Sequence, residues 1–108
     1  MSGKTQIRWL MQTGAIAFCL GYHVSWAFAA DAEKGKTIAR RWCAACHVVS
    51  PDQKEGNTDA PSFASIARRK PKSRLMAFLT DPHPKMPDMS LTREEIADIA
   101  EYISSLKP

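Results

Sequence analysis

Apolar residues recur at helical spacing in the last part of the chain. From position 92 onward they fall three or four places apart, while acidic residues occupy the other faces. The apolar stripe consists of Ile96, Ile99, Ala100, Ile103 and Leu106. Thr92 and Glu95 have the spacing of a capping box, in which each side chain accepts a hydrogen bond from the other residue's backbone N–H. The pattern therefore predicts a strong amphipathic helix beginning at Thr92.

Three further segments are predicted to be helical. Asp31 to Trp42 contains mostly good helix formers and leads straight into Cys43, with Gly35 as its one weak position. Two shorter helices are expected over residues 62–69 and 72–80, the second ending at Asp81-Pro82. Alternating runs typical of strands are almost missing after position 30. The pattern thus predicts a small helical domain.

The first thirty residues have a different character. A short basic stretch with Lys4 and Arg8 precedes a mostly apolar stretch, and small residues follow at Ala27-Phe28-Ala29. This order is typical of a secretory signal peptide. We expect residues 1–29 to be a signal peptide cleaved after Ala29 or Ala30, which leaves residues 30–108 as one domain.

Two other fates of this segment fit the sequence less well. A retained membrane anchor would have to place several polar residues, among them Gln12 and His23, inside the bilayer. Lipid attachment at Cys19 is disfavoured because Phe18 stands where a small residue is expected. Export with cleavage, and hence a periplasmic domain that is not an integral membrane protein, remains the prediction.

The charge of the remaining domain excludes one class of partner. It has thirteen basic and eleven acidic residues, a balance too weak for nucleic-acid binding. Five basic residues nevertheless fall within seven positions: Arg68, Arg69, Lys70, Lys72 and Arg74. Such a run is either a solvated face or a docking patch for an acidic partner.

The sequence Cys43-Ala44-Ala45-Cys46-His47 is the strongest chemical signal. It has the C-x-x-C-H pattern of covalent haem attachment. In a helical turn, residues three apart project from the same side, so both thiols can reach the two vinyl groups of one porphyrin edge. His47 would then coordinate the iron through a neutral imidazole nitrogen. We expect one haem c, which would also supply much of the core of so small a domain.

Three other readings of the cysteine pair fit less well. A thioredoxin-like redox pair needs alternating strands, which the sequence lacks. A structural zinc site needs four ligands, and only His83 remains beyond the C-x-x-C-H segment. A plain disulfide would leave His47 without a role.

With these residues in view, the domain resembles a class I c-type cytochrome of the small bacterial kind. The resemblance implies the all-α cytochrome c fold, in which the N-terminal and C-terminal helices cross and short helices and loops wrap one haem. Gly35 matches the family's glycine at that crossing, and Ile99 and Tyr102 match the pair on the last helix. Ala39 stands where the family usually has an aromatic residue.

The resemblance also implies the remaining site residues. Met86, followed by Pro87, matches the methionine that supplies the sixth iron ligand, with Met89 and His83 as alternatives. A thioether is a soft, neutral donor that favours ferrous iron. Pro61 matches the proline whose carbonyl accepts from the ligand histidine. Arg68, Arg69, Lys72 or Arg74 could pair with the haem propionates, and the sequence does not choose among them.

An iron with six ligands has no open position for a substrate, so we expect electron transfer and no catalysis. The resemblance implies a monomeric periplasmic carrier whose partners are redox proteins: a quinol-oxidising complex, a dehydrogenase or a terminal oxidase. Two alternatives stay open. One is a fixed haem c subunit of an enzyme complex, and the other is a gas-sensing or peroxidase-like haem protein with a vacant sixth position.

Overall fold

The computed structural model describes residues 21, 29–82 and 84–108. Almost all of the expected signal peptide, including Cys19, and the candidate ligand His83 lie outside the described residues. Within the described part, no helix is long and apolar enough to cross a membrane.

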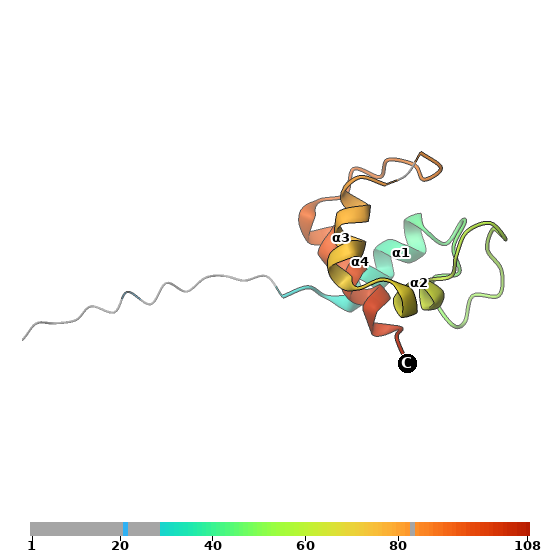
Figure 1. The fold of residues 1–108 in the computed structure, drawn as a ribbon, viewed down its shortest axis with the longest axis horizontal. Helices are drawn as coiled ribbons and strands as arrows, with labels where there is room; N and C mark the ends of the chain where they lie inside the picture. The colour runs from blue at the N-terminus through green and yellow to red at the C-terminus, as the bar shows by residue number, and fades with distance from the viewer. Residues whose placement is uncertain (1–20, 22–28, 83) are drawn as a thin grey trace, which may run out of the picture.

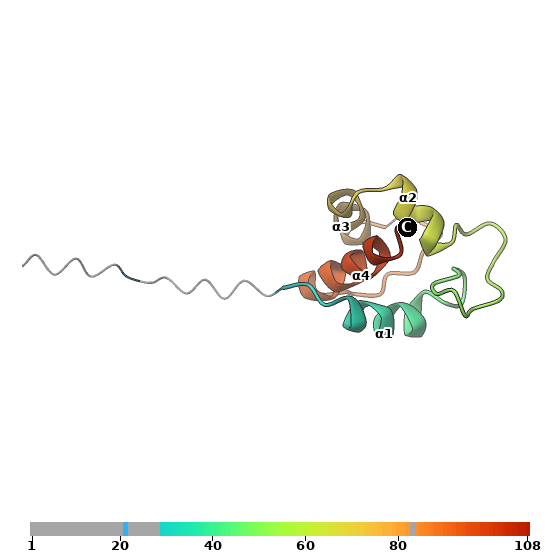
Figure 2. The same ribbon diagram turned by 90° about the horizontal axis from the view of Figure 1, so that it is seen from below.

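Four helices make up the regular structure of the described residues, and none of these residues forms a strand. They are α1 (Ala32–Trp42), α2 (Phe63–Arg69), α3 (Lys72–Thr80) and α4 (Arg93–Ser105). Helix α4 lies in the middle, with α1 on one side and α2 and α3 on the other (Figures 1 and 2). The prediction of an all-α fold is therefore confirmed.

Side-chain caps explain where three of the helices begin. Asp31 precedes α1, and its carboxylate accepts from the backbone N–H groups of Glu33 and Lys34. Ser62 caps α2 in the same way. At α4 both halves of the predicted capping box are present, since Thr92 Oγ1 accepts from Glu95 N and Glu95 Oε2 accepts from Thr92 N.

Helices α1 and α4 cross in direct backbone contact at Gly35. A Cβ built on Gly35 would lie 2.0 Å from the carbonyl oxygen of Asp98 and 2.9 Å from the nitrogen of Ile99. No side chain fits at that distance, so only glycine permits this approach. The start of α1 is also joined to the middle of α4, because Asp31 N donates a 2.7 Å hydrogen bond to Asp98 Oδ1. The expected role of Gly35 at the helix crossing is confirmed.

The core fills the space between α4 and the other three helices. Ile99 is completely buried, and the Tyr102 and Phe63 rings lie 6.3 Å apart, centre to centre. Ala39 is also completely buried, so the small residue in place of the usual aromatic lies inside the crossing region. The core cluster consists of Ala39, Cys43, Val49, Phe63, Ala67, Leu75, Ile99, Ala100, Tyr102 and Ile103.

The contact at Gly35 gives a first prediction. An alanine in place of glycine normally stabilises a helix by about 1 kcal/mol, yet Gly35→Ala should destabilise this protein by about 2 kcal/mol or more because the helices must separate. Denaturant unfolding of the holoprotein measures the difference. The control Lys34→Ala, at the exposed neighbouring position, should stay within about 0.5 kcal/mol of the wild type. A Gly35→Ala protein as stable as the wild type would contradict the close crossing.

Candidate cofactor-binding site

The C-x-x-C-H segment continues the C-terminal end of α1 as a further helical turn. Cys46 N and His47 N both donate to the carbonyl oxygen of Cys43, at 3.1 and 2.8 Å. The two cysteines therefore lie on one turn of the backbone, three residues apart. Cys43 is buried, with 6 % of its surface exposed, whereas Cys46 is exposed.

Burial also affects the chemistry of the Cys43 thiol. It raises the pKa of Cys43 to about 11, because an apolar environment disfavours the thiolate. At neutral pH this side chain is thus a neutral thiol that can lie among apolar groups without the cost of a buried charge.

The imidazole of His47 is hydrogen-bonded to Pro61, the residue that precedes the N-cap of α2. Its Nδ1 lies 2.6 Å from the carbonyl oxygen of Pro61, and its ring centre lies 5.5 Å from that of Phe63. A carbonyl oxygen can only accept, so this hydrogen bond places the proton on Nδ1. Nε2 is then left with its lone pair, as a metal-ligating histidine requires.

A cavity of about 490 Å³ brings most of the predicted site residues together. Cys43, His47, Pro61 and Met86 all line it. The remaining lining residues are Phe63, Ile66, Arg69, Lys70, Arg74, Leu75, Ala77, Phe78, Leu79 and Ile103. Its volume falls within the range of roughly 300–1,000 Å³ found for cofactor pockets. Cys46 is not among the lining residues.

The two candidate methionines differ in their surroundings. Met86 lines the cavity, whereas Met89 packs against the hydrophobic core. The loop between them turns at Asp88, whose carboxylate accepts from Ser90 N at 2.8 Å, and Ser90 has a positive φ of 49°. Met89 lies within this turn and packs against the core, whereas Met86 lies before the turn and lines the cavity.

The five basic residues between positions 68 and 74 lie in different surroundings. Arg69, Lys70 and Arg74 line the cavity, but Arg68 and Lys72 do not. Lys72 forms an ion pair with Glu101 of α4 instead. Of the residues predicted for the propionates, the structure therefore places Arg69 and Arg74 at the cavity and adds Lys70.

Gln53 binds together the backbone around the C-x-x-C-H turn. Its Nε2 donates to the carbonyl oxygens of Ala44, His47 and Glu55, at 3.1, 2.8 and 2.9 Å. Its Oε1 accepts from Val49 N at 3.0 Å. Four backbone groups in irregular structure thus find a partner in one side chain.

Gly56 lets the same loop approach the cysteine turn. A Cβ at this position would lie 2.8 Å from the carbonyl oxygen of Cys46. The neighbouring Asn57 N donates to that oxygen at 2.7 Å. A side chain on residue 56 would therefore push the loop away from the turn that bears His47.

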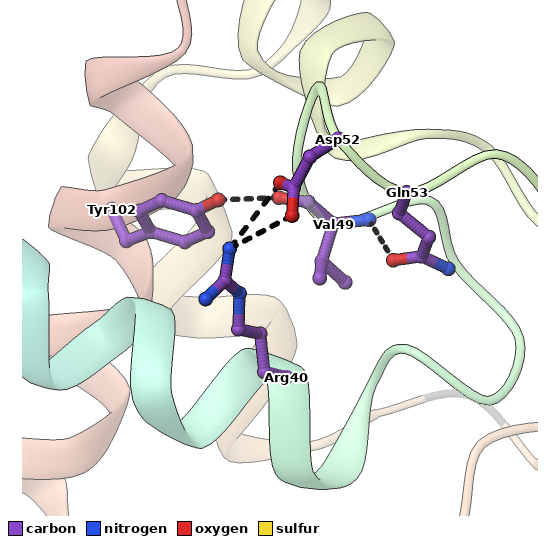
Figure 3. A network of polar contacts seen from close by, with 5 residues as sticks. All are labelled: Arg40, Val49, Asp52, Gln53 and Tyr102. Carbon is purple, nitrogen blue, oxygen red and sulfur yellow. Dashed lines mark hydrogen bonds and ion pairs between the residues drawn. The ribbon is translucent and has the colours of Figure 1, made fainter.

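Polar contacts connect this loop to α1 and α4 (Figure 3). The Tyr102 hydroxyl donates to the Val49 carbonyl oxygen at 2.5 Å, and burial raises the pKa of this phenol, which keeps it a donor. Arg40 of α1 pairs with Asp52 at 3.2 Å. Hydrogen bonding, first from the Ser50 side chain, together with the charge of Arg40, lowers the pKa of Asp52.

The donors at the cavity fit a covalently attached haem. The turn offers two thiols, His47 offers a free Nε2 on an imidazole fixed by Pro61, and Met86 offers a thioether from another loop. The rest of the lining is mostly apolar, with cations from one segment. Within the described residues, no three His, Cys, Asp or Glu side chains are grouped to hold a metal ion.

Comparison with known proteins also indicates a protein with covalently attached haem. Residues 30–103 match the family model described as cytochrome c oxidase, cbb3-type, subunit III. Cytochrome c-552 of Bradyrhizobium diazoefficiens is 56 % identical over 84 residues, covering 76 % of this chain and 81 % of the relative. A cytochrome c-553-like protein of Synechocystis is 28 % identical over 81 residues, covering 74 % of this chain and 73 % of the relative. No solved structure matches the chain significantly.

The fold and the site thus define a c-type cytochrome. The chain belongs to the cytochrome c family, in the group of small single-haem proteins, and its cofactor is haem c. Its role as an electron-transfer protein follows from that membership.

Several supporting residues were not predicted from the sequence. Gln53 and Gly56 lie in a polar loop without periodicity, and their roles depend on where the loop folds back. Lys70 was missed as a cavity residue because a run of cations does not show which side chains face inward. The sequence offered one signal for this role of Gly56, namely that it is a glycine in the polar loop that follows C-x-x-C-H.

The position of Gln53 gives a second prediction. Gln53→Glu keeps the shape but removes both N–H donors and places a carboxylate against three carbonyl oxygens. We expect a loss of about 1–3 kcal/mol in unfolding free energy at neutral pH. Because such surroundings raise the carboxyl pKa in the folded state, the loss should shrink as the pH falls through that raised pKa.

Denaturant unfolding of the holoprotein across the pH range measures this loss. Lys54→Gln, at the exposed next residue, changes the net charge by the same amount and should have little effect. Equal stability of the Gln53→Glu protein and the control would show that the Gln53 hydrogen bonds do not hold the loop.

Proposed function

We propose that this chain is an exported one-electron carrier whose haem c is held by Cys43, Cys46, His47 and Met86. The observation that carries the proposal is that His47 and Met86, from separate loops, line one cavity together with Cys43. When bound, haem c supplies one-electron chemistry by cycling between ferric and ferrous iron. The residues of the chain determine how tightly the haem is held and at what reduction potential its iron gains and loses an electron.

Each ligand residue has a distinct task in this proposal. The thiols of Cys43 and Cys46 would hold the cofactor through thioether bonds, each formed by addition of S–H across one haem vinyl group. The Pro61 carbonyl holds the His47 Nδ1 proton, fixes the ring and makes Nε2 a stronger donor. The Met86 thioether is neutral and soft, so it favours the ferrous state relative to a second histidine. An iron held by both His47 and Met86 would have no open position for a substrate.

The cavity lining favours a carrier in two further ways. Phe63, Leu75 and Ile103 present apolar surface and keep water from the iron ligands. Arg69, Lys70 and Arg74 line the cavity and would supply the cations that the two haem propionates need, since burial of the propionates without cations would be costly.

Export completes the proposal. The charged, apolar and small-residue order of residues 1–29 supports cleavage after Ala29 or Ala30 and a periplasmic domain at residues 30–108. We propose a monomer there that meets redox proteins, such as a quinol-oxidising complex, a dehydrogenase or a terminal oxidase, in brief encounters with small interfaces.

One second function is favoured by a specific observation. The family model that matches residues 30–103 is described as a subunit of an oxidase, whereas the two relatives are named as cytochromes. A haem c subunit that stays bound to an enzyme complex would use the same ligands. Gel filtration of the native protein, solubilised gently, separates the two: a carrier elutes as a free monomer of the domain's size.

Covalent attachment and export give a third prediction. The protein is isolated from cells and then denatured for mass spectrometry. The spectrum should show a chain that begins at Ala30 or Asp31 and carries one haem. Cys43→Ala combined with Cys46→Ala should remove the haem stain from denaturing gels and prevent normal folding, because the cofactor fills much of the core. A stably folded, haem-free double variant would contradict the assigned attachment, and an intact Met1 in a membrane fraction would support the anchor.

The sixth ligand gives a fourth prediction. Met86→Ala should abolish the sulfur-to-iron charge-transfer band at the red end of the oxidised spectrum, lower the reduction potential, and allow carbon monoxide or cyanide to bind. Met89→Ala is the matched control: it should keep the band, although loss of packing by this half-buried side chain should cost about 1 kcal/mol of stability. His83→Ala should also keep the band.

The opposite pattern would assign the ligand to Met89. A wild-type protein without the band that binds carbon monoxide readily would favour a ligand-binding haem protein over a carrier.

A further inference from the structure

The short loop of residues 53–57 holds the backbone of the turn that bears the two cysteines and His47. Gln53 Nε2 donates to the carbonyl oxygens of Ala44 and His47, at 3.1 and 2.8 Å. Asn57 N donates to the carbonyl oxygen of Cys46 at 2.7 Å. Three carbonyl groups of the turn are therefore bound from outside it, two of them by one side chain.

These contacts reach the turn away from the cofactor cavity. His47 lines that cavity, but neither Gln53 nor Asn57 is among its lining residues. The oxygens that Gln53 and Asn57 bind all belong to the backbone of the turn. Gln53 can therefore act on a bound cofactor only through the position of the turn.

The Gln53 amide is itself fixed in one orientation. Its Oε1 accepts from Val49 N at 3.0 Å, and the Val49 carbonyl oxygen accepts from the Tyr102 hydroxyl at 2.5 Å (Figure 3). The partners of Nε2 are all carbonyl oxygens, so a flipped amide would lose the hydrogen bonds at both of its ends. Gln53 therefore joins the turn to α4 through Val49 and Tyr102.

His47 is consequently held at two points. Gln53 holds its backbone carbonyl, and the Pro61 carbonyl holds Nδ1 of its ring at 2.6 Å. An imidazole that donates a short hydrogen bond from Nδ1 is a stronger electron donor through Nε2, and a stronger donor stabilises ferric iron. Release of the backbone would let the ring settle without this short bond, and the ferrous state would then gain stability relative to the ferric state.

We propose that Gln53 is a positioning residue for the haem ligand His47. By fixing the backbone of His47, it preserves the hydrogen bond from Nδ1 to Pro61 and thereby sets the reduction potential. The proposal rests on the proposed function, in which His47 binds the iron of an electron carrier. A potential that depends on one hydrogen bond stays constant only while the ligand residue is fixed at both ends.

The test compares two variants of the holoprotein that keep the net charge. Gln53→Leu is similar in size and removes every hydrogen bond of the amide. Tyr102→Phe is the matched control, because it removes one hydrogen bond from the same loop and leaves the Gln53 amide in place. Both variants should unfold at a lower denaturant concentration than the wild type, since each leaves a buried polar group without its partner.

The reduction potential separates the two variants. Each holoprotein is equilibrated with a hexacyanoferrate(II)/(III) mixture of fixed composition, in which one electron passes between the haem iron and hexacyanoferrate. The ferrous-to-ferric ratio, read from the visible spectrum, should be about threefold higher in Gln53→Leu than in the wild type and within about 1.5-fold of the wild type in Tyr102→Phe.

A second measurement reports on the hydrogen bond itself. In the ferrous holoprotein, NMR follows the exchange of the His47 Nδ1 proton with solvent. Exchange should be about fivefold or more faster in Gln53→Leu than in Tyr102→Phe, because only the former releases the backbone of His47. Gln53→Asn keeps an amide on a shorter side chain, so it should lie between the wild type and Gln53→Leu in both measurements. It also provides the test if Gln53→Leu does not fold.

Three results would overturn the positioning role while leaving the carrier function intact. They are a wild-type ratio in the Gln53 variants, an equal shift in Tyr102→Phe, and a shift toward the ferric form. The first two would leave Gln53 as support for the loop alone, and the third would contradict the stated effect on the Pro61 hydrogen bond. A wild-type holoprotein that exchanges no electron with hexacyanoferrate would overturn the carrier function itself.

Discussion

The close crossing of α1 and α4 at Gly35 determines the position of nearly everything else in the domain. Because backbone meets backbone there, the axis of α1 is fixed against α4. The end of α1 then delivers the turn with Cys43 and His47, while α4 contributes Ile103 to the cavity and Tyr102 to the loop that follows the turn. A few tenths of an ångström at the crossing would thus be passed on to both walls of the site.

The loop between His47 and α2 depends on side chains where helices depend on their own backbone. Residues 48–61 form no regular element, so their buried polar groups need other partners. Gln53 and the Tyr102 hydroxyl supply them, and Phe63 N donates to the Val48 carbonyl oxygen at 2.9 Å. This support keeps the Pro61 carbonyl within reach of His47. The His47 imidazole is therefore oriented by a loop whose shape is fixed by several independent hydrogen bonds.

The sequence predicted what depends on local pattern. Helix limits followed from caps such as Thr92 and from apolar spacing, and the C-x-x-C-H segment identified the cofactor because its chemistry is contained in five adjacent residues. The position of Pro61 was expected only through resemblance to a family. Gln53 and the inward-facing Lys70 were not predicted, because their roles arise from contacts between segments whose relative placement no local pattern encodes.

His47 and Met86, the two residues proposed to hold the haem iron, are fixed in the fold in different ways. His47 lies in a turn joined to α1 and is fixed by a 2.6 Å hydrogen bond. Met86 lies in a loop between α3 and α4 that contains Pro82, Pro84 and Pro87, residues that restrict the unfolded chain and so reduce the entropy lost on ordering. Packing of Met89 against the core anchors that loop. His47 is therefore fixed by a turn of the backbone and a hydrogen bond to Pro61, whereas the position of Met86 depends on the conformation of its loop.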